Sequence, residues 1–314
     1  MSIKVRDIAH VRLRAPDLDE MEEFLTEFGM SRAARTDTAL YMRGTDPAHH
    51  IHVTEKGDPA FVGFAYRAVS EDDLRTVAKM PGASGVETID EPGGGKRVRL
   101  TEPNGYQMEV IWGQSELAPI PVRFQKLNSG PEGQNRAGEL MRIHTGPSRV
   151  KRVGHGVMGV PDVKKTVGWF RETLGMVRSD DVFAGQEENV IGSFNRCDAG
   201  DEYVDHHVLF CMKNERAGMN HISFEVHDVD DVFTGHQHLE KLGKYEHMWG
   251  IGRHLLGSQV YDYWADPWGR VHEHWADSDV LNKSYGTRYV DAAVGLNSQW
   301  GEPAPMEFIQ HVSP

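Results

Sequence analysis

The chain repeats itself, and this internal repeat constrains the fold more than any other feature of the sequence. Residues 8–30 read IAHVRLRAPDLDEMEEFLTEFGM, and residues 153–176 read VGHGVMGVPDVKKTVGWFRETLGM. Each segment begins like a strand that carries a histidine, His10 or His155, and continues through Pro-Asp into an amphipathic helix that ends at Gly-Met. Because such self-similarity is typical of a duplicated structural unit, we expect two halves with the same architecture.

Two further pairs of segments extend this correspondence. VGFAYRAVSEDDL at 62–74 matches HISFEVHDVDDV at 221–232, since each is a short alternating strand before an acidic helix start. VRLTEPNGYQMEVIW at 98–112 matches VYDYWADPWGRVHEHW at 260–275, and their Pro-x-Gly turns superpose without a gap. Each half therefore contains two βα units with additional strands.

This pattern predicts an α+β fold of two tandem domains, each formed by two βαβββ modules that make a curved, barrel-like mixed sheet. We expect the first domain at 1–113, a Pro/Gly-rich connector at 114–150 and the second domain at 151–277. The polar tail at 278–314 is expected to pack over the surface or against a partner subunit.

Charge and composition exclude several classes of partner. The net charge of -13 argues against nucleic acid and anionic membranes, because both are bound by basic surfaces. The first 18 residues carry charges throughout, unlike a signal peptide, and no stretch has the length of a membrane span. Cys197 and Cys211 form no CxxC pair, which fits a reducing compartment. We expect a cytoplasmic protein.

The two halves differ at three repeat-related positions that could bind a metal. In the second half these positions hold His155, His221 and Glu273. In the first half they hold His10, Gly63 and Glu109, so the middle ligand is missing. Two histidines and one carboxylate from separate strands form the facial triad of non-haem iron(II) enzymes and leave coordination positions open. We predict a metal site in the second half and a decayed site in the first.

Other histidines cluster without a carboxylate at a repeat-related position. They are His49, His50, His52, His236, His238, His272 and His274. We interpret them as surface residues or outward-facing packing. By strand alternation, the last two should face away from the side of the strand that carries Glu273.

The stretch GRHLLGSQVYDYWADPWGRVHEHW at 252–275 resembles the C-terminal signature of type I extradiol dioxygenases in the vicinal oxygen chelate superfamily. That signature has a histidine, a tyrosine nine residues later, a Pro-x-Gly turn and a glutamate ten residues after the tyrosine. Here these residues are His254, Tyr263 and Glu273. The strand at 153–163 resembles the first ligand motif, and the resemblance covers nearly the whole chain. The segments YDYW and HEHW look closest to trihydroxytoluene oxygenases and their relatives.

The resemblance implies an enzyme that uses O2 and a mononuclear iron(II) to cleave a catechol-type or trihydroxylated aromatic ring at a bond next to its diol. Such a reaction belongs to the catabolism of aromatic compounds. Manganese(II) is the alternative metal, and family members usually assemble as homo-oligomers. His254 and Tyr263 are expected to hydrogen-bond substrate oxygens. Many relatives have a polar residue where this chain has Leu256, so we expect the substrate pocket to differ in polarity on that wall.

The general acid–base is expected within the pair His206–His207, because imidazole titrates near neutral pH. Strand alternation along VDHHVLF directs the two side chains to opposite faces, so only one can face the metal. The family pattern HHxL favours His207, whereas the pattern H-x-I-A-F favours His206. We prefer His207 and keep His206 as the alternative.

Two other functions are compatible with the same superfamily. One is a glyoxalase-like lyase or isomerase that uses the metal as a Lewis acid, and His254 with Tyr263 argues against it. The other is a binding module that holds a ligand without metal, and the complete triad argues against that. A metal assay tests the second, and oxygen uptake with a catechol tests the first.

Overall fold

The computed structural model describes residues 3–123 and 126–313 of the chain. Its first half contains β1 (Val5–Ala15), α1 (Leu18–Glu27), β2 (Ser31–Arg35), β3 (Ala39–Arg43), β4 (His52–Lys56), β5 (Ala60–Ala68), α2 (Glu71–Val77), β6 (Glu87–Thr88), β7 (Lys96–Thr101) and β8 (Gln107–Trp112). This order is βαβββ followed by βαβββ, as the repeat predicts.

The second half repeats the order with one additional short strand. It contains β9 (Val150–Val160), α3 (Val163–Leu174), β10 (Val177–Phe183), β11 (Val190–Arg196), β12 (Val204–Asp205), β13 (Leu209–Lys213), β14 (Gly218–Val226), α4 (Val229–Leu242), β15 (His247–His254), β16 (Val260–Ala265) and β17 (Val271–Ala276). The tail adds β18 (Val280–Leu281), the 3-10 helix η1 (Lys283–Tyr285), β19 (Arg288–Asp291), α5 (Ala292–Gly295), β20 (Ser298–Trp300) and α6 (Met306–Gln310).

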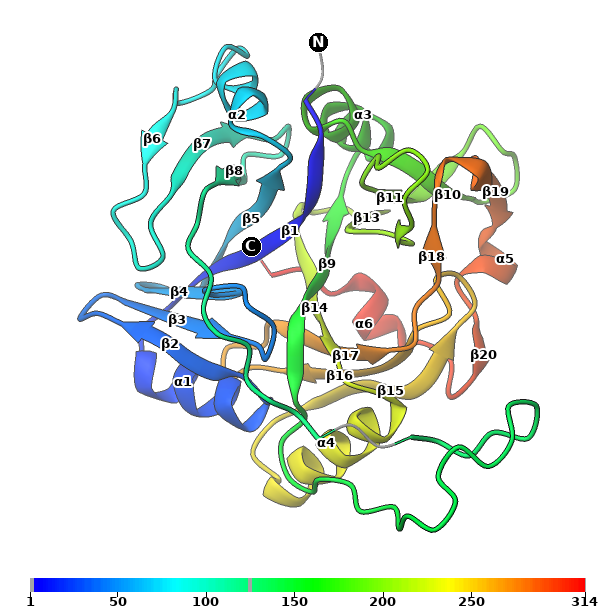
Figure 1. Ribbon diagram of the computed structural model, residues 1–314. Coiled ribbons are helices and arrows are strands. Elements are labelled where there is room, and N and C mark those ends of the chain that lie inside the picture. The colour runs from blue at the N-terminus through cyan, green and yellow to red at the C-terminus, as the bar shows by residue number, and fades with distance from the viewer. Residues whose placement is uncertain (1–2, 124–125, 314) are drawn as a thin grey trace.

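The strands form two large mixed sheets (Figure 1). The first sheet has the order β2-β3-β4-β1-β5-β8-β7-β6, and the second has β19-β10-β11-β13-β9-β14-β17-β16-β15-β20. At the centre of each, two long strands run antiparallel, β1 with β5 and β9 with β14, and each has a parallel neighbour on its other side. The α+β fold with two tandem pairs of βαβββ modules is confirmed.

The helix boundaries follow from local chemistry. Asp17 and Asp162 are the N-caps of α1 and α3, and their carboxylates accept hydrogen bonds from backbone N–H groups of the first turn. Gly175 ends α3 in the left-handed conformation at φ 69°, which glycine adopts without steric cost. The helices bury their apolar faces in a core cluster that includes residues of both halves.

The tail packs on the second half of its own chain. β19 extends one edge of the second sheet beside β10, and β20 extends the other edge beside β15. Beyond α6, Ser313 bridges to Met219 of β14. The tail thereby reaches the same strand that carries His221. No helix in the described part of the chain is long and apolar enough to cross a membrane.

Candidate metal centre

The three predicted ligands come from three adjacent strands, β9, β14 and β17. Ser223 on the middle strand lies opposite both His155 and Glu273, and His221 is two positions before Ser223. Because side chains alternate along a strand, this register places all three ligands on one face of the sheet. The tertiary structure therefore brings together residues that lie up to 118 positions apart in the sequence.

The ligand atoms converge on one carboxylate oxygen. His155 Nε2 lies 3.1 Å and His221 Nε2 lies 3.5 Å from Glu273 Oε2. The potential ligand atoms of all three residues lie within 4.8 Å of one another. Metal–ligand bonds of about 2 Å place neighbouring donor atoms about 3 Å apart, so this spacing fits a single ion.

The hydrogen bonding of these residues also fits a cation. Glu273 is fully buried, and neither of its carboxylate oxygens has a hydrogen-bond partner of ordinary geometry among the described residues. A buried carboxylate without compensation is strongly unfavourable, whereas coordination to a cation satisfies it. The donor set of two imidazoles and one carboxylate suits iron(II) or manganese(II).

Electrostatics keeps His221 and Glu273 in the protonation states that metal binding requires. Burial lowers the pKa of His221 to about 3, so its imidazole is neutral. Burial by itself would raise the pKa of Glu273, but the adjacent His155 and His254 hold it well below its usual value. Neutral imidazole and ionised carboxylate are the forms that bind metal.

Asn220 orients one ligand, and the sequence analysis did not identify it. Its Oδ1 lies 2.7 Å from His221 Nδ1, which therefore carries the proton and leaves Nε2 free for a metal. The Asn220 amide also donates to the carbonyls of Phe308 and His311 in the tail. A polar residue beside a histidine ligand in an apolar strand was the available signal.

A pocket lies beside these ligands, and both His155 and His221 line it. Its walls are mostly apolar and include Phe194, Phe210, Met212, Trp249, Leu256 and Phe308. No Lys, Arg, Asp or Glu lines it in the described part of the chain. The tail thus contributes Phe308 to the pocket, whereas the sequence analysis predicted only surface or subunit packing for the tail.

His254 and Tyr263, which we expected to hydrogen-bond the substrate, both line this pocket. His254 Nε2 lies 2.8 Å from the Tyr263 hydroxyl and 3.7 Å from Glu273 Oε1. Burial raises the pKa of Tyr263 well above its ordinary value, so the phenol is protonated. The pair therefore presents a hydrogen-bonded hydroxyl and imidazole beside the carboxylate ligand.

His206 and His207 lie between β12 and β13 and not within a strand, so the expected strand alternation does not apply to them, but their surroundings differ. His207 lines the pocket, and its ring centroid lies 4.1 Å from that of His155. His206 does not line the pocket, and its Nε2 lies 2.6 Å from Asp180 Oδ2. Burial, which contributes most, lowers the pKa of His207 well below its ordinary value, so its imidazole is neutral.

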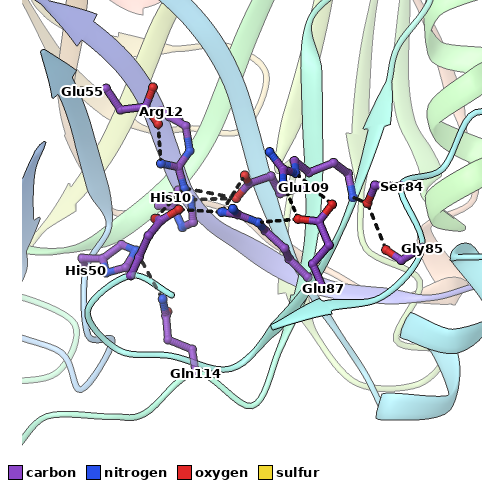
Figure 2. A network of polar contacts seen from close by, with 12 residues as sticks. His10, Arg12, His50, Glu55, Ser84, Gly85, Glu87, Glu109 and Gln114 are labelled. Carbon is purple, nitrogen blue, oxygen red and sulfur yellow. Dashed lines mark hydrogen bonds and ion pairs between the residues drawn. The ribbon is translucent and has the colours of Figure 1, made fainter. Parts of the chain in front are cut away.

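In the first half, arginine side chains fill the position that corresponds to the candidate metal site of the second half (Figure 2). His10 Nε2 lies 3.5 Å from Glu109 Oε2, as a ligand pair would. However, guanidinium nitrogens of Arg12 and Arg97 lie 3.4 and 3.3 Å from the same carboxylate. These fixed positive charges compensate Glu109 in the place where a metal would otherwise do so.

The missing middle ligand cannot be accommodated in the first half. A Cβ atom at Gly63 would lie 1.6 Å from the backbone oxygen of Gln107. In the second half, the paired residue opposite His221 is Val271. The backbone of the first half therefore occupies the space that a side chain at Gly63 would need.

The remaining histidines are less exposed than we expected. We expected surface residues or outward-facing packing, and the burial of His49, His50 and His52 excludes the first of these alternatives. His272 and His274 do face away from Glu273, toward His52 and the carbonyl of Phe28. His236 and His238 are half-buried and contact Asp262 and Glu27. The sequence pattern could not reveal these partners because they lie on distant elements.

Comparison with known proteins identifies relatives over the full length of the chain. The family model described as the Glyoxalase/Bleomycin resistance protein/Dioxygenase superfamily matches residues 7–110 and 152–271. Metapyrocatechase 2 of Cupriavidus necator is 30% identical over 313 residues, which cover 98% of this chain and 92% of that protein.

Two solved structures share the fold at lower identity. Homoprotocatechuate 2,3-dioxygenase from Brevibacterium fuscum, in complex with 3,4-dihydroxyphenylacetate, superposes with a TM-score of 0.81 at 16% identity and covers 99% of this chain and 93% of that one. The Mn(II)-bound glyoxalase from Novosphingobium aromaticivorans gives 0.78 at 21% identity and covers 99% of this chain and 97% of that one.

Proposed function

Because this chain belongs to the Glyoxalase/Bleomycin resistance protein/Dioxygenase superfamily, as one of its extradiol ring-cleaving dioxygenases, we propose that it opens catechol-type rings with O2 at a mononuclear iron(II). His155, His221 and Glu273 would hold the ion. The observation that carries the proposal is the buried Glu273 carboxylate, which has two imidazole nitrogens facing one oxygen and no hydrogen-bond partner of ordinary geometry among the described residues.

Iron(II) or manganese(II) held by His155, His221 and Glu273 would supply the Lewis-acid and redox chemistry for the reaction of a catechol with O2. The protein supplies the other requirements. The apolar walls hold the flat ring and exclude water, and the face of the sheet orients the diol toward the ligands.

Proton movement is assigned to the pocket side chains. His207 is neutral and adjacent to His155, so its imidazole can accept a proton from the substrate and return it as the ring opens. The Tyr263 hydroxyl and His254 Nε2, 2.8 Å apart, would hydrogen-bond a substrate oxygen. All three residues would contact the substrate directly and would therefore be catalytic residues.

The pocket walls favour an uncharged ring substituent. The Brevibacterium fuscum enzyme was solved with a substrate that carries a carboxylate, 3,4-dihydroxyphenylacetate. No Lys or Arg side chain lines the pocket in the described part of this chain, and the apolar side chain of Leu256 forms part of its wall. A buried carboxylate without a partner is unfavourable, so catechol or an alkyl- or hydroxyl-substituted catechol fits better.

The fold alone does not separate ring cleavage from a glyoxalase-type reaction, because solved structures of both kinds superpose on this chain. Oxygen uptake separates them. Protein reconstituted anaerobically with iron(II) should consume O2 with catechols and form a coloured ring-opened product, and uncharged catechols should outperform 3,4-dihydroxyphenylacetate. No oxygen uptake with any catechol, together with full iron content, would contradict the proposal.

Two variants test the assignment of the ligands. His221→Ala should lose one equivalent of iron relative to the parent, because only two protein ligands remain. His10→Ala should retain the parent's iron content, because Arg12 and Arg97 already compensate Glu109. Equal losses of iron from both variants would overturn the assignment of the site to the second half.

A further inference from the structure

A second group of two histidines and one carboxylate lies in the second half, built from residues outside the pocket described above. It joins His236 of α4, His247 of β15 and Asp262 of β16. His236 Nδ1 lies 3.1 Å and His247 Nε2 lies 2.8 Å from the same oxygen, Asp262 Oδ1. The potential ligand atoms all lie within 4.8 Å of one another.

This cluster lies on the opposite side of the sheet from the pocket. Asp262 and Tyr263 are consecutive residues of β16, and their side chains therefore point to opposite faces. Tyr263 lines the pocket, whereas Asp262 points toward the side covered by α4, which packs on β16 and β17 (Figure 1). The two sites are thus separated by the thickness of the sheet.

No Lys or Arg of the described residues forms an ion pair with the Asp262 carboxylate. It is fully buried, and among the described residues its side-chain partners are His236, His247 and Trp264. The Trp264 indole donates to Oδ2 at 2.6 Å and so fixes the orientation of the carboxylate. Oδ1 is left facing two imidazole nitrogens, an arrangement that a cation would satisfy.

The first half shows that the fold does not need a carboxylate at this position. The gapless superposition of the two Pro-x-Gly turns places Val98 on Asp262, and Val98 is completely buried. An apolar side chain therefore fills the related position in the sister module. The carboxylate in the second half is accompanied by the two histidines, which points to a role beyond packing.

We propose that His236, His247 and Asp262 bind a divalent transition-metal cation of the zinc class, which clamps α4 to β15 and β16. Imidazole and carboxylate ligands together suit zinc, cobalt or nickel rather than magnesium, which prefers oxygen ligands. The side chains of His236 and His247 are 22% and 31% exposed, so an ion can enter from solvent and retain a water ligand.

Cobalt(II) tests this site in the iron-loaded protein. Equilibrium dialysis against Co2+, with both metals counted by mass spectrometry, should find one cobalt per chain in addition to the iron. The visible absorption of bound cobalt should report a low coordination number, and the thermal unfolding midpoint should rise with cobalt. Mg2+ at the same concentration should produce none of these changes.

Matched variants separate this site from the first. His247→Gln and His236→Gln should each lower the cobalt affinity by about 100-fold or more and leave the iron content intact, which also shows that the variant is folded. His238→Gln, on the same helix but bonded to Glu27, should bind cobalt like the parent. The proposal is overturned if the parent binds no second ion, or if both Gln variants retain it.

Discussion

The Nδ1 atoms of His206 and His207 lie 3.0 Å apart, but the two rings belong to different environments. His207 lines the pocket beside His155, and His206 is held on the other side by Asp180. The role of His207 as acid–base stays a prediction, and its place beside His155 is compatible with it. His206 is in contact with His207 and can orient its ring.

Replacing His207 by Ala should slow ring cleavage by about 10²–10⁴-fold while iron stays bound, because a general acid–base is removed and no ligand is lost. Oxygen uptake and iron content on the same sample measure both effects. His206→Ala is the comparison, and it leaves the buried Asp180 without its shortest hydrogen bond. We expect it to lose about 1–3 kcal/mol of stability, with iron bound and turnover of the folded fraction largely retained. The reverse pattern would transfer the role to His206.

Asn220→Ala should weaken metal binding by about 10–100-fold, because His221 loses the partner that sets its tautomer and ring orientation. Iron retained during dialysis against graded chelator measures the change. Asn214→Ala is the matched control, since Asn214 also donates to a tail carbonyl, that of Gln310, without contacting His221. A similar loss of iron in both variants would assign the effect to the tail instead.

Gly63→Ala should destabilise the protein by about 3 kcal/mol, because its Cβ would overlap the Gln107 carbonyl and the strands would have to separate. Gly168→Ala in α3 is the control. Nothing lies within 4 Å of a Cβ there, so alanine should be neutral or stabilise the helix by up to about 1 kcal/mol. Urea unfolding of both variants measures the difference. A stable Gly63→Ala protein would show that the first half can still open at this position.

Glu109→Gln should be less stable than the parent at neutral pH, and this deficit should shrink in acid. Burial alone would raise the pKa of Glu109, but the adjacent His10 and the Arg12 guanidinium lower it from 4.5 to about 2. A lowered pKa stabilises the native state above pH 4.5, and this contribution disappears as the pH falls toward 2. We expect a deficit of about 2–3 kcal/mol at pH 7 that declines below pH 4.5, measured by unfolding at several pH values. A deficit independent of pH would contradict the role of its charge.

The sequence by itself determined the modular order and identified three candidate metal ligands. Strand and helix periodicity, the N-caps Asp17 and Asp162 and the Pro-x-Gly turns are local signals, because they depend on residues a few positions apart. Duplication then supplied the long-range information. Aligning the halves shows that His221 of the second half corresponds to Gly63 of the first half. Comparing equivalent positions of the two halves thus indicates which distant residues belong to one site.

Only the tertiary structure decided which side chains surround the pocket, Glu109 and Asp262. The guanidinium of Arg12 beside Glu109, the ring of Phe308 in the pocket and the pairing of His236 with Asp262 each join residues from distant elements. No repeat or periodicity records such contacts. They depend on how sheet register, helix packing and the path of the tail place side chains in three dimensions, and a local pattern carries no information about that placement.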